Sequence, residues 1–203
     1  MDYIKLLKDN GLLRVIDEPV DIDLEIAHAS YIEVKRENSQ ALLFSNPICK
    51  KTGRKFAPVL TNIYGSKHAL ELIFGREPDK IASEIEKLLK PKKPKSFGEK
   101  LNFAAYLFEM RKIFTKRLKT RGECQEIAYF GDAVDLNLLP VLKTWPLDGG
   151  AFITMGQVYT QSLDGELQNV GMYRLQIYGK NRLGMHWQIH KDGAGFSDEY
   201  RKA

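Results

Sequence analysis

The spacing of apolar residues changes near Gly122, and this change limits the fold more than any other feature of the sequence. In most segments before it, apolar residues recur at helical spacing, as in residues 79–89. After it come strand-like segments, rich in β-branched and aromatic residues and separated by glycine turns. Because the main type of predicted element changes from helix to strand, we predict two domains, residues 1–118 and 119–203.

The first domain is predicted to combine helices with short strands in a small α/β layer structure. Helices are expected over residues 1–10, 22–37, 65–74, 79–89 and 97–117, and strands over residues 12–16, 41–44 and 57–63. Asp21 or Asp23 is expected to cap the second helix, because a side-chain oxygen accepts from the free N–H groups at a helix start. Residues 50–55 are expected to form a polar turn.

Residues 90–95, KPKKPK, break the helical pattern. Two prolines among four lysines cannot continue a helix. One interpretation is a solvated linker, and the other is a basic patch that binds nucleic acid. The net charge of +5, from 31 basic and 26 acidic residues, mildly favours anionic partners, but the charges are mixed and form no basic stripe. We therefore expect no nucleic-acid partner.

The second domain is predicted to begin with an antiparallel β-meander. Strands are expected over residues 151–160, 169–178 and 183–189, with turns at Asp164-Gly165 and at residues 179–181. The tail, residues 196–203, carries no signal that we could interpret. The whole chain is therefore predicted to be α+β, with an N-terminal α/β domain followed by a domain of antiparallel strands.

Composition indicates a folded, soluble protein. Hydrophobic residues make up 43% of the 203 residues, which is enough for a core. No run approaches the roughly 18 apolar residues of a membrane span, and the N-terminus lacks the features of a signal peptide. Cys49 and Cys124 have no metal-ligand spacing and are read as free thiols. We expect a cytoplasmic location.

Three polar segments in the second domain are candidates for chemistry. The first, WPLDGG at residues 145–150, is either a structural turn or a loop whose backbone lies against a ligand. The second, NVGMYR at residues 169–174, places Arg174 in a predicted strand on the same face as Met172. Such an arginine either meets an anion or points to water from an edge strand.

The third segment is GMHWQIHKDGAG, residues 184–195. His186, Gln188 and His190 alternate on one face of the predicted strand, where histidines are either metal ligands or half-exposed polar residues. Lys191 and Asp192 are expected to begin a glycine-rich loop that can meet a phosphate. No one of the three segments is specific by itself.

Taken in order, WPLDGG, a strand, NVGMYR and GMHWQIHKDGAG closely resemble the prenylated-flavin-binding region of the UbiD family of carboxy-lyases. The resemblance extends more loosely over the N-terminal part, including LLRV and FSNP. It implies non-oxidative decarboxylation of an aromatic or α,β-unsaturated acid, such as a polyprenyl-4-hydroxybenzoate in ubiquinone biosynthesis. It also implies that the second domain begins a split β-barrel like that of flavin reductases.

The resemblance implies a cofactor and partners as well. The cofactor would be prenylated FMN (prFMN), made by a flavin prenyltransferase and held through its phosphate by a divalent metal, usually Mn²⁺, and by K⁺. The protein would be a homo-oligomer. A polyprenylated substrate would bring it to the membrane surface as a peripheral protein.

Family roles transfer to this sequence by position. Asn169 and His190 would be metal ligands. The residues that would line the cofactor are Met172, Tyr173, Arg174, His186, Trp187, Gln188, Lys191 and Asp192. Arg174 would also be catalytic, since it would pair with the substrate carboxylate and help to hold an acid.

Two acidic residues that the family uses, a third metal ligand and a proton donor, lie downstream of the region that matches residue 193. We therefore expect the 203-residue chain to be inactive alone, while the full-length protein would be a decarboxylase. The alternative is a non-catalytic flavin- or phosphate-binding module that works with a partner chain.

Overall fold

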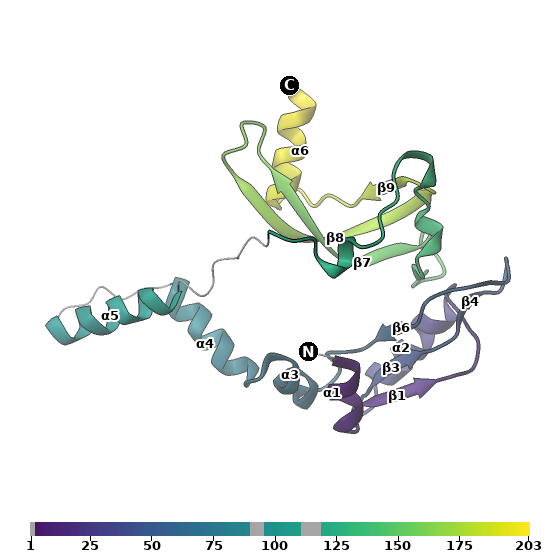
Figure 1. Cartoon of the computed structure of the whole chain (residues 1–203), viewed down its shortest axis with the longest axis horizontal. Coiled ribbons are helices and arrows are strands. Elements are labelled where there is room, and N and C mark those ends of the chain that lie inside the picture. Colours follow the sequence, from purple (N-terminus) through teal and green to yellow (C-terminus); the bar gives the residue numbers. More distant parts are fainter. Residues whose placement is uncertain (1–2, 90–95, 111–118) are drawn as a thin grey trace. The chain divides into compact units, whose positions relative to one another are not determined.

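The computed structural model describes residues 3–89, 96–110 and 119–203 (Figure 1). They divide into two compact units: Met1–Leu70 with Gly131–Ala203, and Glu71–Phe130. The chain is a mixed α+β protein with small sheets, as predicted.

The first unit contains a three-stranded sheet in the order β1-β3-β6. Its strands are β1 (Leu13–Ile16), β3 (Ala41–Phe44) and β6 (Val59–Thr61). β1 and β3 are parallel, joined through α2 (Glu25–Val34), and β6 runs antiparallel to β3. The three strands confirm the strand predictions for this region.

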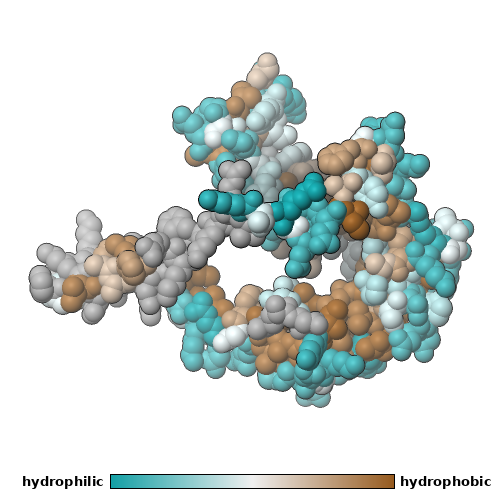
Figure 2. Space-filling model, in the orientation of Figure 1, coloured by the Kyte–Doolittle hydropathy of each residue, from teal (hydrophilic) through white to brown (hydrophobic). Residues whose placement is uncertain are grey.

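Helices cover both faces of β3. Its successive side chains point to opposite faces, as in any strand. On one face Ala41 packs with Leu7 of α1 (Tyr3–Asp9) and Ala69 of α3 (Lys67–Phe74). On the other face Leu42 and Phe44 pack with Ile26 of α2. Figure 2 shows apolar residues gathered over this sheet and its helices.

A second small sheet has the order β2-β4-β5. It consists of β2 (Val20–Asp21), β4 (Pro47–Cys49) and β5 (Arg54–Lys55). The polar turn predicted at residues 50–55 is present up to Gly53, whose φ of +70° favours glycine, but its last two residues form β5. Strands this short leave no apolar pattern to read.

Neither aspartate caps α2, so that prediction is wrong. The helix begins at Glu25, after Leu24, and no side chain caps it. Asp21 Oδ1 instead accepts from the Asp23 N–H, and Glu25 Oε2 accepts from the Asp21 N–H. The carboxylates fold back on their own turn, which competes with capping.

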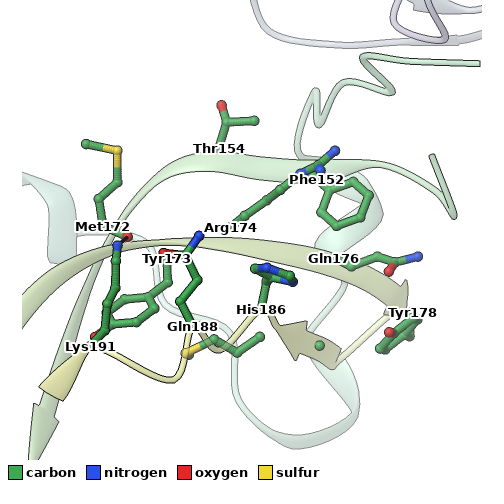
Figure 3. A pocket seen from close by; sticks show the side chains of 12 residues that line it. Phe152, Thr154, Met172, Tyr173, Arg174, Gln176, Tyr178, His186, Gln188 and Lys191 are labelled. Atoms are coloured by element: carbon green, nitrogen blue, oxygen red, sulfur yellow. Dashed lines mark hydrogen bonds between the residues drawn. The ribbon is translucent and has the colours of Figure 1, made fainter. Parts of the chain in front are cut away.

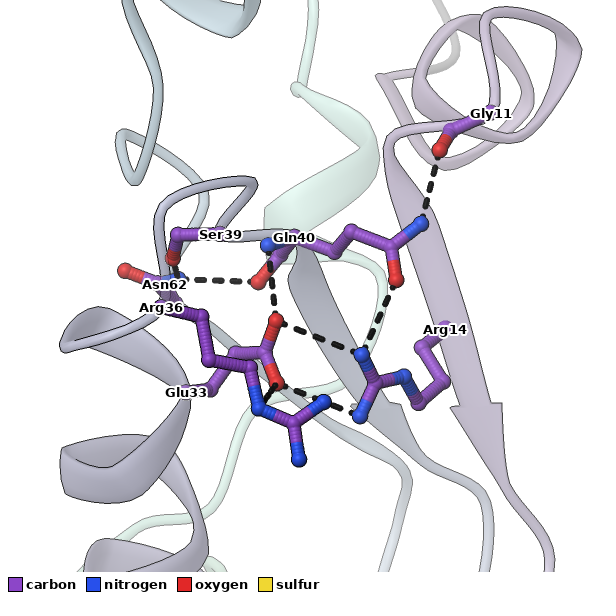
Figure 4. A network of polar contacts seen from close by, with 7 residues as sticks. All are labelled: Gly11, Arg14, Glu33, Arg36, Ser39, Gln40 and Asn62. Atoms are coloured by element: carbon purple, nitrogen blue, oxygen red, sulfur yellow. Dashed lines mark hydrogen bonds and ion pairs between the residues drawn. The ribbon is translucent and has the colours of Figure 1, made fainter.

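A buried carboxylate joins the end of α2 to β1 and to the start of β3 (Figure 4). The Glu33 side chain is 3% exposed and pairs with Arg14 at 3.2 Å and Arg36 at 3.5 Å. Its Oε1 accepts from the Gln40 N–H at 3.0 Å, and the Gln40 amide in turn binds the Gly11 carbonyl at 2.7 Å. Glu33 therefore satisfies several donors at once.

Replacing Glu33 by glutamine is expected to lower the free energy of unfolding by about 2 kcal/mol, because charge-assisted hydrogen bonds become neutral or are lost. Urea denaturation measures this, with Glu37→Gln at an exposed position of the same segment as the control. Equal midpoints for the two variants would show that the Glu33 network adds no net stability.

The regular structure of the second unit is helical in its described residues. The unit contains the second half of α3, then α4 (Pro78–Leu89), α5 (Phe97–Met110) and the 3-10 turn η2 (Glu123–Gln125). The predicted linker at residues 90–95 and the end of the helix predicted over 97–117 lie outside the described residues. Within the described ranges no helix is long and apolar enough to cross a membrane.

The predicted β-meander is present in Gly131–Ala203. It begins with two 3-10 turns, η3 (Gly131–Ala133) and η4 (Leu136–Leu138). The antiparallel strands β7 (Phe152–Gln161), β8 (Gln168–Gly179) and β9 (Arg182–Met185) follow in that order. In the β7–β8 turn Ser162 Oγ donates to Asp164 at 2.6 Å, which is the main reason that the pKa of the Asp164 carboxyl is lowered.

The chain after Met185 differs from the prediction. The strand expected over 183–189 ends at Met185, and residues 186–191 turn, with the Lys191 N–H donating to the Gln188 carbonyl at 3.0 Å. A helix, α6 (Asp192–Lys202), replaces the expected glycine-rich loop. Asp192 in its first turn and Lys202 in its last turn suit the helix dipole, a signal that was present in the sequence.

Candidate functional site

A cavity of about 540 Å³ lies on one face of the β7–β8–β9 sheet (Figure 3). Alternate side chains of β8 form one wall of the cavity, because every second residue of a strand shares a face. Its lining residues are Phe152, Thr154, Met172, Tyr173, Arg174, Gln176, Tyr178, Gly184, Met185, His186, Gln188 and Lys191. The mixture of aromatic rings, thioethers and hydrogen-bond donors suits a flat ligand with one apolar and one polar edge.

Arg174 occupies a defined position in the cavity wall. Its Nη2 donates to Asp148 Oδ2 at 2.7 Å, and its guanidinium lies 3.7 Å from the centroid of the Phe152 ring. The side chain is 40% exposed. Arg174 was predicted either to meet an anion or to point to water. It meets an anion within the chain, the Asp148 carboxylate.

The WPLDGG loop contacts the site without lining the cavity. Asp148 Oδ2 also accepts from the Trp145 N–H at 3.2 Å. A Cβ at Gly149 would lie 2.9 Å from Nε2 of Gln176, so glycine permits the loop to approach β8 closely. The loop is thus a turn that places the Asp148 carboxylate against Arg174.

Tyr173 anchors the start of α6 against β8. Its side chain is buried, its hydroxyl accepts from the Gly193 N–H at 3.1 Å, and its ring meets Trp187 edge-on at 5.3 Å. Lys191 Nζ lies 4.9 Å from the Tyr173 ring centroid and donates to the Met172 carbonyl at 3.0 Å. These contacts hold the turn that follows β9 beside the cavity.

Asn169, a predicted metal ligand, has one oxygen without a partner. Its Nδ2 donates to Asp192 Oδ2 at 3.0 Å, and since a carboxylate only accepts, this contact fixes the orientation of the amide. Asn169 Oδ1 is then buried and unpaired. Thr160 lies opposite Asn169 in the β7–β8 register, and its hydroxyl oxygen is also buried and unpaired.

His190, the other predicted ligand, lies exposed in the turn after β9. The expected alternation of His186, Gln188 and His190 on one strand face is wrong, because the strand has ended; the first two line the cavity and His190 does not. Among the residues that the structure describes, no group of three or more His, Cys, Asp or Glu side chains is placed to hold a metal.

The structure brings most of the predicted cofactor residues together. Those that line the cavity are Met172, Tyr173, Arg174, His186, Gln188 and Lys191. Trp187 packs behind Tyr173, and Asp192 holds Asn169, so these two lie beside the cavity. Gln176 and Tyr178 were not predicted, although they continue the alternation of Met172 and Arg174 along β8.

Two models of one protein family match the chain. The 3-octaprenyl-4-hydroxybenzoate carboxy-lyase N-terminal domain matches residues 4–89, and the 3-octaprenyl-4-hydroxybenzoate carboxy-lyase Rift-related domain matches residues 116–203. An uncharacterized protein of Helicobacter pylori (strain ATCC 700392 / 26695) is 48% identical over 206 residues, which cover 100% of this chain and 33% of that protein. The chain therefore spans about a third of the length of this relative.

Solved structures share the fold. The vanillic acid decarboxylase of Sedimentibacter hydroxybenzoicus in its closed form has a TM-score of 0.71 at 22% identity, covering 96% of this chain and 38% of that one. An evolved dimeric form of the UbiD-class enzyme HmfF from Pelotomaculum thermopropionicum, in complex with prFMN, has a TM-score of 0.65 at 20% identity. That match covers 99% of this chain and 41% of the HmfF chain.

Proposed function

Because the chain belongs to the UbiD family of carboxy-lyases, we propose that the whole protein is a prFMN-dependent decarboxylase of an aromatic or α,β-unsaturated acid. The observation that carries the proposal is the cavity on β7–β8–β9, which gathers seven side chains from the NVGMYR and GMHWQIHKDGAG segments. The HmfF neighbour, of the same fold, is described in complex with prFMN.

The residues of the cavity fit a flavin. Met172 and Met185 offer soft apolar surface to a ring system, while Gln176 and Gln188 offer amide groups to its polar edge. Lys191 supplies a cation for the phosphate. When bound, the prenylated flavin would supply the electron sink for the carbanion that forms as CO₂ leaves.

Asn169 is suited to be a ligand of the divalent cation. K⁺ is the second ion that we propose for the cofactor phosphate. Asn169 Oδ1 is buried and unpaired, and amide oxygens are suitable ligands for hard cations. Asp192 fixes the amide so that this oxygen stays available. We propose His190 as the second ligand on the family motif alone, since in this structure it lies exposed in the turn after β9.

Arg174 is the proposed catalytic residue of this chain. Its guanidinium has more N–H donors than Asp148 uses, so it can bind and orient a substrate carboxylate on the cavity wall. The Phe152 ring covers one face of the guanidinium and limits its rotation. The chain's own groups would thus bind and orient the acid.

The proposal extends to the domain boundary, the substrate and the cellular setting. The family models support a boundary near residues 118 and 119, and the three-stranded meander is compatible with the start of a split β-barrel. The name of the family models supports a polyprenyl-4-hydroxybenzoate as one candidate substrate, with ubiquinone biosynthesis as its pathway and peripheral membrane contact as its consequence. We also propose a cytoplasmic homo-oligomer that receives its cofactor from a flavin prenyltransferase.

The test is to produce the whole protein together with a flavin prenyltransferase and to measure CO₂ release from a panel of aromatic and unsaturated acids. Turnover of at least one acid is expected, and the 203-residue chain should release none. A whole protein that binds the flavin but releases no CO₂ would favour the flavin-binding module instead. A whole protein that does not bind the flavin would contradict the proposal.

Replacing Asn169 by alanine is expected to weaken Mn²⁺ binding by about tenfold or more, because the unpaired amide oxygen is removed. Electron paramagnetic resonance of free Mn²⁺ measures the affinity without any turnover. Asn137→Ala is the matched control, since Asn137 also donates its Nδ2 to an aspartate, Asp135, but is an exposed residue of η4. An equal loss of Mn²⁺ affinity in the two variants would show that Asn169 is not a metal ligand.

A further inference from the structure

We propose that Asp148 is a positioning residue, which holds the Arg174 guanidinium in place for the flavin. The inference rests on the proposed function, because it gives Arg174 a ligand. It assigns a task to the aspartate of the WPLDGG loop, which is itself outside the cavity lining.

The Arg174 side chain is held at two points. A free arginine side chain has many rotamers, so a defined position requires contacts that remove that freedom. The Asp148 carboxylate at 2.7 Å and the Phe152 ring at 3.7 Å provide them, one in the guanidinium plane and one across its face. Among the described residues, the Phe152 ring is the side-chain contact that would remain without Asp148.

Asp148 is itself fixed before any ligand arrives. Its Oδ2 accepts from the Trp145 N–H, and its own N–H donates to the Trp145 carbonyl at 3.1 Å, which closes a tight turn. The side chain is 14% exposed. Gly149 and Gly150 follow, and a Cβ at either would lie within 3.3 Å of the Gln176 amide. Glycine at both positions therefore lets the turn lie close to the Gln176 side chain of β8.

The arrangement also sets the charge of the cavity wall. Asp148 balances the charge of Arg174 within the chain, so the guanidinium needs no ligand to be stable there. Its unused N–H groups remain available for an anionic edge. Because Asp148 does not line the cavity, it would act on a ligand through Arg174, and this dependence can be measured.

The experiment uses the 203-residue chain and FMN as the probe. Asp148→Ala is expected to weaken FMN binding about tenfold, the size expected for one ordered charge-assisted hydrogen bond, and Asp148→Asn less, since its amide oxygen still accepts. In an Arg174→Gln background Asp148→Ala should add less than about a twofold loss, because a residue that acts through another shows such coupling. Asp198→Asn, which breaks the Asp198–Arg201 ion pair on α6, is the control and should leave FMN affinity unchanged.

A second measurement needs no flavin. The Nε–Hε signal of Arg174 in an NMR spectrum of the apo chain should show restricted motion, which Asp148→Ala abolishes while the melting temperature stays within a few degrees. Normal FMN binding by Asp148→Ala would overturn the inference and leave the proposed function intact. Failure of the unaltered chain to bind FMN would count against the proposed function, and a freely moving Arg174 in that chain would overturn the inference separately.

Discussion

Replacing Arg174 by glutamine is expected to lower kcat/KM of the whole protein by about three orders of magnitude, the upper range for removing one preorganised donor from an active site. Glutamine keeps an amide donor and a similar reach, but it has no charge and no planar fork. It therefore loses both the ion pair with Asp148 and the stacking on Phe152. Initial rates of CO₂ release with the flavin-loaded protein measure the effect.

Two comparisons give this result its meaning. Arg201→Gln removes an arginine at the exposed end of α6 and should keep the full rate. Bound flavin is quantified in each variant by absorbance, so that a loss of cofactor is separated from a slower reaction. An Arg174→Gln protein with bound flavin and a normal rate would show that the guanidinium has no part in the chemistry.

Replacing Gly193 by alanine is expected to destabilise the start of α6 by about 1–3 kcal/mol, the usual cost of overpacking. An added Cβ would lie 2.5 Å from the Tyr173 hydroxyl oxygen and 2.8 Å from the Trp187 ring, both closer than real contacts. One of the two rings must move, and Lys191 beside them would move with the turn. Flavin affinity should therefore fall together with the melting temperature.

The chain supplies a close control on the same helix. A Cβ at Gly195 would meet nothing within 4 Å, and alanine is a better helix former than glycine. Gly195→Ala is therefore expected to raise the melting temperature slightly and to keep flavin affinity. Equal melting temperatures of the two variants would show that the close packing at Gly193 does not contribute to stability.

Elements that depend on nearby residues were predictable from the sequence. The run at 41–44 specifies β3 because a short apolar stretch between turns buries both of its faces. β8 followed from its alternation, which also placed Met172 and Arg174 on one face. Most of the predicted cofactor residues meet in one cavity because they lie on or just after neighbouring strands.

Features that depend on distant contacts were not predictable. The alternation through His186 and Gln188 continued beyond Met185, but the strand ends there as Trp187 packs against Tyr173 and Lys191 closes a turn. Thr160 could be associated with Asn169 only through the β7–β8 register. The pairing of Asp148 with Arg174 spans 26 positions and had no local signal.

The connectivity of the strands has a consequence for the order in which the molecule folds. β7, β8 and β9 are joined by two short turns, so their contacts are local and their hairpins can form quickly. β1 and β3 are parallel and pair across the whole of α2, which requires a larger loop to close first. The β7–β8–β9 sheet, which carries Arg174, can therefore form before the β1-β3-β6 sheet, although β1 and β3 are synthesised first.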